Sequence, residues 1–321
     1  MKKFARLAAL LSLGALLGST GAGAADLVPV YTPPAGGTYF VLGAGMVTVS
    51  NRFMSDVKYV QEATTGTLDI VRKMTARASE GKPVFGLFGS PDGWNAYKGA
   101  AEYTKTPFTT LRAVVSGPGT DVYLVVPAKS PIKTYADVKG KRIGMGGPGS
   151  TPANTAHFLL DQHGVTKADF KPFYYTYKET AEGIQDGSLD GGFLAGSFPV
   201  AIMTELSSRT DVRIVPVDEN VFKKALPDHP YYYRNVVRPK AYKGVEVDTP
   251  VLGFGGGVWT HAGVSDDMVY KFLKNLFEHK EDFYSIHPAA KWMTHQTAMF
   301  GPTVPFHPGA LKYYKEIGIA K

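Results

Sequence analysis

One short unit recurs along this chain of 321 residues. It is a β-type run, then a turn that combines glycine with serine or threonine, then a segment with apolar residues at helical spacing. Its clearest copy has the run at 141–145, the turn at 146–152 and the helical segment at 153–160. Further copies start with the runs at 27–31, 59–64 and 83–88. Strands that alternate with helices predict an open α/β sheet, in which such turns gather at the carboxyl ends of the strands, where ligands bind.

The turn Gly146-Gly147-Pro148-Gly149-Ser150-Thr151-Pro152 indicates an anion site. Thr151 suits the N-cap of the following helix, and Pro152 suits its first helical position. The free amides and the dipole of that helix would then face an anion. Tight packing alone is the alternative explanation for the glycines. The spacing matches neither a Walker loop nor a dinucleotide fingerprint, so nucleotide chemistry is not indicated.

The rest of the chain predicts two strands at 111–115 and 121–126, the second long enough to cross between lobes, and a glycine-interrupted strand that returns at 251–260. The segment 227–247 is expected to be irregular. The remaining expectations are strands at 173–177, 190–197 and 212–217, a turn with a short helix at 131–138, and helices at 180–187, 199–206, 266–278, 289–299 and 310–317.

The first 24 residues have the pattern of a secretory signal peptide. Lys2, Lys3 and Arg6 form the positive region, residues 7–17 form the apolar core, and 22–24 form an Ala-x-Ala cleavage site. No later segment is long and apolar enough to span a membrane. We therefore expect an exported, soluble mature chain that begins at residue 25 and works in the periplasm.

Composition excludes several classes of site. The chain contains no cysteine, so no disulfide or thiolate site can form. Loss of the three signal-peptide cations lowers the formal charge from +7 to +4, and the dispersed basic residues do not predict nucleic-acid binding. The eight histidines show no metal-ligand spacing. His287 and His307 precede prolines at helix starts, where a capping or packing role is expected. No metal or cofactor is predicted.

Five segments together carry a likeness to one known family. They are Gly36-Gly37-Thr38-Tyr39-Phe40-Val41-Leu42-Gly43, Thr65-Gly66-Thr67, residues 138–150, residues 186–193, and the pair 287–290 and 307–314. In this order they resemble the TAXI-type solute receptors of TRAP transporters (tripartite ATP-independent periplasmic transporters). The likeness covers essentially the whole mature chain.

The resemblance implies a two-lobed periplasmic-binding-protein fold of type II, with a ligand cleft between the lobes and two hinge crossings. Lobe I would comprise 25–124 and 254–321, and lobe II 125–253. It also implies delivery of a small organic anion, such as glutamate, 2-oxoglutarate or a similar C4–C5 dicarboxylate, to TRAP membrane permease subunits. Two departures from the family pattern, Gly89-Ser90-Pro91 and Gly149-Ser150-Thr151-Pro152, fall at expected pocket positions.

The candidate binding residues combine hydroxyls with backbone donors, which hold carboxylates well. They are Gly37, Thr38, Tyr39, Gly66, Thr67, Ser90, Gly149, Ser150, Thr151, Phe193 and Ser197. Helix capping is the alternative role for the two threonines Thr67 and Thr151, and core packing is the alternative for Tyr39 and Phe193. A second carboxylate would need a cation, for which the sequence offers Arg112, Lys178, Arg234 and Arg238 without deciding among them.

Three functional hypotheses remain open. The first is a receptor without catalytic activity that binds a small organic anion. The second is the same receptor with a roomier site for an aromatic or bulkier acid, because the chain has 18 Tyr and 18 Phe. The third is a periplasmic hydrolase or isomerase, although neither the Gly-x-Ser-x-Gly nor the His-Glu-x-x-His pattern occurs.

Overall fold

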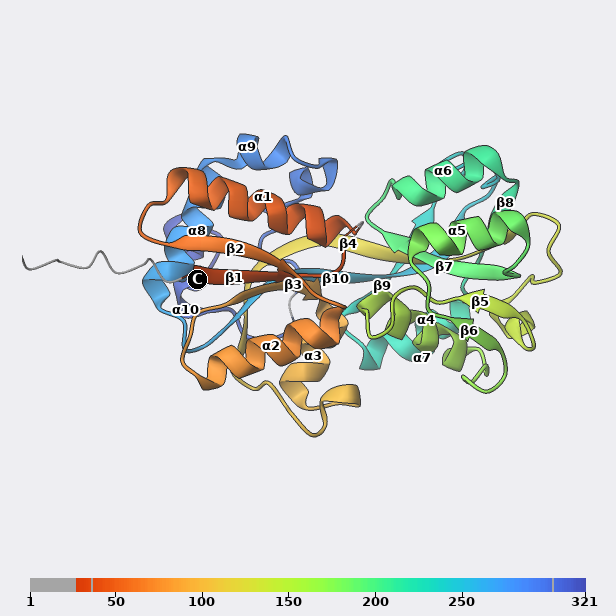
Figure 1. The fold of residues 1–321 in the computed structure, drawn as a ribbon, viewed down its shortest axis with the longest axis horizontal. Helices are drawn as coiled ribbons and strands as arrows, with labels where there is room; N and C mark the ends of the chain where they lie inside the picture. Colours follow the sequence, from red (N-terminus) through yellow and green to blue (C-terminus); the bar gives the residue numbers. More distant parts are fainter. Residues whose placement is uncertain (1–26, 36, 302) are drawn as a thin grey trace, which may run out of the picture.

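The computed structural model describes residues 27–321 except 36 and 302. The signal peptide expected at 1–24 lies outside the described residues. The described chain forms one mixed sheet in the order β2-β1-β3-β10-β4-β7-β5-β6, with β8 on β4 and β9 on β10. Helices cover both faces of the sheet, and Figure 1 shows them gathered into two lobes. The predicted α/β fold with two lobes is confirmed.

Lobe I contains the start and the end of the described chain. The parallel strands β1 (Leu27–Thr32), β2 (Lys58–Ala63) and β3 (Phe85–Gly89) form its sheet with one end of β10. Its helices are α1 (Thr38–Phe53), α2 (Thr67–Ser79), α3 (Ser90–Lys98), α8 (Asp266–Glu278), α9 (Lys280–Tyr284) and α10 (Pro308–Glu316). One core lies among α1, α8 and α10, and a second lies under α2 and α3.

Lobe II is built from the middle of the chain. Its strands are β5 (Arg142–Gly144), β6 (Lys171–Phe173), β7 (Gly191–Gly196), β8 (Val212–Val215) and β9 (Tyr232–Val237). Its helices are α4 (Thr151–Gln162), α5 (Tyr177–Asp186), α6 (Ala201–Arg209) and α7 (Glu219–Ala225). One core lies beneath α4 and α7, and another beneath α5 and α6.

Two long antiparallel strands, β4 (Leu111–Pro127) and β10 (Thr249–His261), join the lobes. The expected pair of strands at 111–115 and 121–126 is one continuous strand, so the prediction of a break was wrong. Pro118, which has no N–H, is tolerated because the ladder between β4 and β10 shifts register between Phe254 and Gly256. Both predicted crossings between the lobes are therefore present, and they lie side by side.

Other segments differ from expectation, and one of them, α7, was not expected at all. The segment 227–247 was expected to be irregular, yet Tyr232–Val237 forms β9, because its edge position on β10 tolerates polar side chains. Strand 173–177 ends at Phe173, since Thr176 caps α5 by accepting from the N–H of Glu179 at 3.2 Å. The helix expected at 289–299 is only a short 3-10 helix, Pro288–Trp292, and α9 before it was not expected.

His287 and His307 behave as helix caps, which confirms that expectation. The Nδ1 atom of His287 accepts from the N–H of Ala289, and that of His307 accepts from the N–H of Gly309, both at 3.1 Å. Within residues 27–321, leaving aside 36 and 302, no helix is long and apolar enough to cross a membrane.

Candidate ligand-binding site

Four helices begin with a hydroxyl residue at their first helical position. These residues are Thr38 in α1, Thr67 in α2, Ser90 in α3 and Thr151 in α4. The expectation that Thr151 is the N-cap was wrong by one position. Ser150 is the cap, because its Oγ accepts from the N–H of Ala153 at 3.3 Å. The Thr151 hydroxyl is thereby free of capping and available for other contacts.

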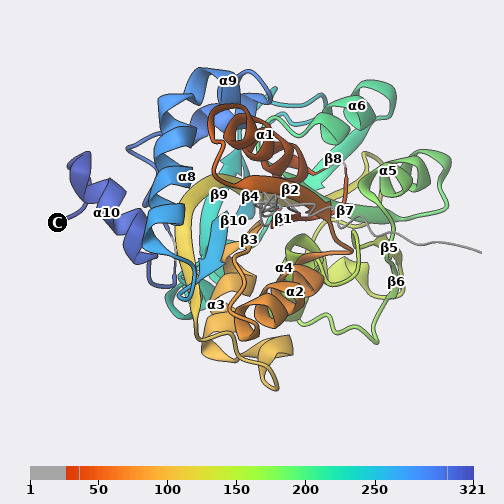
Figure 2. The ribbon, with the colours of Figure 1, turned by 60° about the vertical axis from the view of Figure 1, so that its left-hand side comes forward.

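The starts of α2 in lobe I and α4 in lobe II meet directly. The Oγ1 atoms of Thr67 and Thr151 lie 2.9 Å apart, and both residues are at most 3% exposed. The N–H of Leu68 donates to the carbonyl of Gly149 at 3.3 Å. Figure 2 shows α2 beside α4. Two helix N-termini, each with positive partial charge, thus face one another across the junction of the lobes.

Glycines make this close approach possible. Gly66 has φ +154°, and a Cβ there would lie 3.2 Å from the carbonyl oxygens of Pro148 and Gly149. A Cβ on Gly89 would lie 2.6 Å from the methyl group of Thr151. The end of β3, which leads into Ser90, therefore packs against the first turn of α4. The structure brings Gly66, Thr67, Ser90, Gly149, Ser150 and Thr151 into one neighbourhood.

Tyr39 and Ser197 contact the crossing strand β4. The Tyr39 hydroxyl donates to the carbonyl of Pro118 at 2.8 Å, and the Ser197 hydroxyl donates to the carbonyl of Gly119 at 2.7 Å. Gly37 is the N-cap residue of α1, and Thr38 follows it. Tyr39 and Ser197 therefore lie beside the strand that crosses between the lobes, and burial raises the pKa of Tyr39.

Phe193 and the four candidate cations are placed elsewhere. Phe193 is 2% exposed and packs in the core of lobe II. Arg112 donates to the carbonyl of Leu111 at 2.9 Å, near the far end of β4. Lys178, Arg234 and Arg238 form ion pairs with Glu182, Glu219 and Asp248, respectively.

Two buried carboxyl groups at the junction were missed by the sequence reasoning. Asp92, in the first turn of α3, is 2% exposed, and burial raises its pKa to about 6. Asp121, at the crossing in β4, is 4% exposed, and burial likewise raises its pKa to about 6. An acid two residues after Ser90, in a turn that is expected to bind anions, was the available signal for Asp92.

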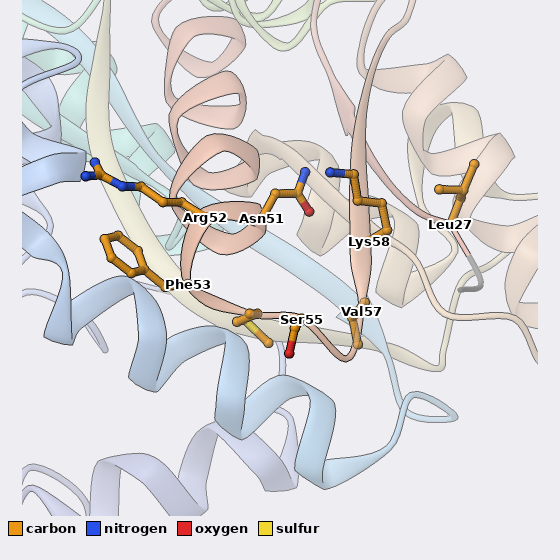
Figure 3. A pocket seen from close by; sticks show the side chains of 8 residues that line it. Leu27, Asn51, Arg52, Phe53, Ser55, Val57 and Lys58 are labelled. Atoms are coloured by element: carbon orange, nitrogen blue, oxygen red, sulfur yellow. The ribbon is translucent and has the colours of Figure 1, made fainter. Parts of the chain in front are cut away.

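A cavity of about 560 Å³ lies far from these residues. It lies where α1 ends and where β1 and β2 begin, and Figure 3 shows Arg52, Phe53 and Lys58 around it. The helix N-termini described above lie at the opposite, carboxyl ends of the strands. This cavity therefore does not belong to the candidate site.

The junction offers hydrogen-bond donors that suit an anion. They are the hydroxyls of Thr67 and Thr151 and the backbone N–H groups at the starts of α2 and α4. No group of three His, Cys, Asp or Glu side chains suited to a metal occurs in the part of the chain that the structure describes.

Comparison with solved structures supports the two-lobed fold. The periplasmic binding protein BugD matches with a TM-score of 0.54 and 15% identity, over 91% of this chain and 94% of BugD. XAC2383 from Xanthomonas citri, bound to ATP, matches with a TM-score of 0.52 and 12% identity, over 91% and 95% of the two chains. At this identity the likeness shows the fold alone.

The family of this chain follows from a match of its sequence to a family model. The model of the NMT1-like family matches residues 30–318, which is almost all of the described chain. The match includes both crossing strands and all four helix starts that carry a hydroxyl residue. This chain belongs to the NMT1-like family.

Proposed function

We propose that this protein is a periplasmic solute receptor that binds a small organic anion at the junction of the lobes. The observation that carries the proposal is the contact between Thr67 and Thr151, which joins two helix N-termini from different lobes. Hydrogen bonds from such donors to a carboxylate are charge-assisted and therefore stronger than neutral ones. An anion held there would contact both lobes and favour the closed form.

The transport role is the finer part of the proposal. The resemblance to TAXI-type receptors supports delivery of the ligand to TRAP permease subunits. The signal-peptide pattern of the first 24 residues supports export to the periplasm. The expected lobes, 25–124 with 254–321 and 125–253, stay a prediction. We propose 117–120 and 254–256 as the hinge, because β4 and β10 change register there.

Glutamate, 2-oxoglutarate and similar C4–C5 acids are the first candidate ligands. An aromatic acid is the second candidate, because aromatic side chains lie on both sides of the junction. The rings of Trp94 in lobe I and Tyr231 in lobe II lie 6.4 Å apart, and within lobe II Phe158 stacks on Tyr232 at 4.8 Å. Nothing in the site favours a hydrolase or isomerase over these receptor hypotheses.

Thermal unfolding of the mature chain, residues 25–321, tests the proposal. The panel is glutamate, glutamine, 2-oxoglutarate, succinate, benzoate and phosphate. A ligand at about 100 times its Kd should add about 2.7 kcal/mol, a shift of a few degrees in Tm. A shift with one organic acid, and no turnover of it, supports the receptor function. If neither the panel nor mass spectrometry of the denatured protein reveals a bound acid, the proposal is contradicted.

A further inference from the structure

Asp92 has an unusual position for a carboxyl group. It belongs to α3 of lobe I, yet hydrogen bonding from the side chains of Thr151 and Asn154, in α4 of lobe II, lowers the pKa that burial raises. Its Oδ1 accepts from the Tyr103 hydroxyl at 3.0 Å. Its Oδ2 is buried and makes no hydrogen bond of normal geometry among the residues that the structure describes, so Thr151 and Asn154 are close to it but not well placed as donors. A buried polar atom without a well-formed hydrogen bond is costly, so this oxygen can accept or share a proton with a further group.

The described groups that affect the Asp92 carboxyl are hydroxyls, an amide and an acid, and none of them is a cation. Tyr103 and Glu102 face it from the short helix Ala101–Tyr103, and Tyr231 and Tyr232 face it from the segment that begins β9. Glu102 is acidic, and burial raises the pKa of the three tyrosines, which keeps them neutral. Among the described ion pairs, none includes Asp92.

We propose that Asp92 contacts the ligand as a neutral acid and shares its proton with the ligand's carboxylate, so that each anion binds together with one proton. This inference rests on the proposed function, because it concerns the ligand of the same junction. The proton comes from solvent and returns there when the ligand leaves, and no covalent bond changes. Asp92 is then a residue that selects for carboxylic acids.

Charge explains why the proton is needed. Thr67, Thr151 and the helix N-termini favour an anion at the junction. A second carboxylate nearby would repel that anion, and the repulsion is removed when one of the two acids keeps its proton. Because burial already raises the pKa of Asp92 to about 6, the proton is taken up at little cost near neutral pH. A bound anion raises this pKa further.

Calorimetric titration between pH 5.5 and 8.5 tests the inference. The probe is each panel acid that raises Tm, measured in buffers of different ionisation enthalpy. The wild-type Kd should weaken by up to about tenfold per pH unit above about pH 6, with uptake of up to one proton per ligand. A Kd that is constant with pH, or that weakens toward acid pH as expected for an Asp92 carboxylate that accepts from a ligand ammonium, would overturn it.

Three variants test whether Asp92 is the residue that makes the Kd depend on pH. Asp92→Asn should bind with a Kd that does not change with pH, because the amide is a permanent donor. Asp121→Asn, at the other buried carboxyl, should keep the wild-type pH dependence. His229→Gln should also keep it, although His229 lies 2.7 Å from the Tyr231 hydroxyl. If the Kd of Asp92→Asn still depends on pH, a residue other than Asp92 takes up the proton.

A failure of this inference can be distinguished from a failure of the proposed function. If an acid binds with a pH-independent Kd and without proton uptake, only this inference is overturned. If no panel acid binds at any pH and none is found in the denatured protein, the proposed function fails and this inference fails with it. The proton-uptake measurement uses the wild-type chain, so it does not depend on whether a variant folds.

Discussion

Gly257→Ala should lower the free energy of unfolding by about 3 kcal/mol, because a Cβ cannot be accommodated between the crossing strands. The added atom would lie 2.3 Å from the carbonyl oxygen of Val115 and 3.2 Å from Cα of Ser116. Both are backbone atoms of β4, so no side chain can rotate to make room. Since β4 and β10 also join the lobes, the strain falls on the element that both lobes share. Chemical denaturation with a two-state fit measures the change.

Gly147→Ala is the matched control for this prediction. A Cβ at Gly147 meets no atom within 4 Å, so the same substitution should change stability by no more than about 0.5 kcal/mol. Equal stabilities of the two variants would mean that β4 and β10 do not approach as closely as the structure has them.

The His157→Gln variant should lose less stability than the wild type when the pH is lowered. Burial, together with the charge of Lys167, lowers the pKa of His157 to about 4. The unfolded chain therefore binds a proton at this residue near pH 6.5 and the folded chain does not. The stability that His157 contributes is present above pH 6.5 and is lost as pH falls from about 6.5 toward 4. By pH 5 the loss is about 2 kcal/mol.

The measurement is the free energy of unfolding of wild type and variant at pH 8, 6.5 and 5. As pH falls from 8 to 5, the free energy of unfolding of the wild type should decrease more than that of the variant, because the variant lacks the titrating imidazole. Tyr174→Phe is the control: it removes the hydroxyl that lies 3.1 Å from Nε2 of His157 but keeps the imidazole, so its pH profile should follow the wild type. If the free energy of unfolding depends on pH in the same way in His157→Gln and in the wild type, His157 is not the group whose protonation destabilises the fold.

Local patterns predicted most of the fold. The helix at 266–278 is α8 with the same ends, because an amphipathic repeat lies between the capping Ser265 and a change of pattern. The predictions failed where distant pairing overrides local preference. β4 runs through Gly117-Pro118-Gly119 because β10 lies alongside, and β9 forms at 232–237 because an edge of β10 is free to pair.

The candidate site was predictable in its parts but not in its assembly. Glycine-rich turns with hydroxyl residues marked the helix starts, and the structure brings Thr67 and Thr151 together although they are 84 residues apart. Ser150 caps α4, and its neighbour Thr151 does not. The spacing of residues in the sequence cannot decide which of two adjacent hydroxyl residues is the cap. Asp92 was missed because its significance depends on burial, which only the packing of two lobes creates.

Calorimetry on Thr67→Val/Thr151→Val tests the central claim, that the facing helix starts bind the ligand. Valine preserves shape and removes both hydroxyls, so Tm without ligand should change little. With the panel acid that stabilises the wild type most, the Kd should weaken at least about tenfold, because hydrogen bonds to charged groups contribute about 1.5–3 kcal/mol each. Thr48→Val, on the exposed face of α1, should bind as the wild type does. An unchanged Kd in the double variant would place the ligand outside the junction of α2 and α4.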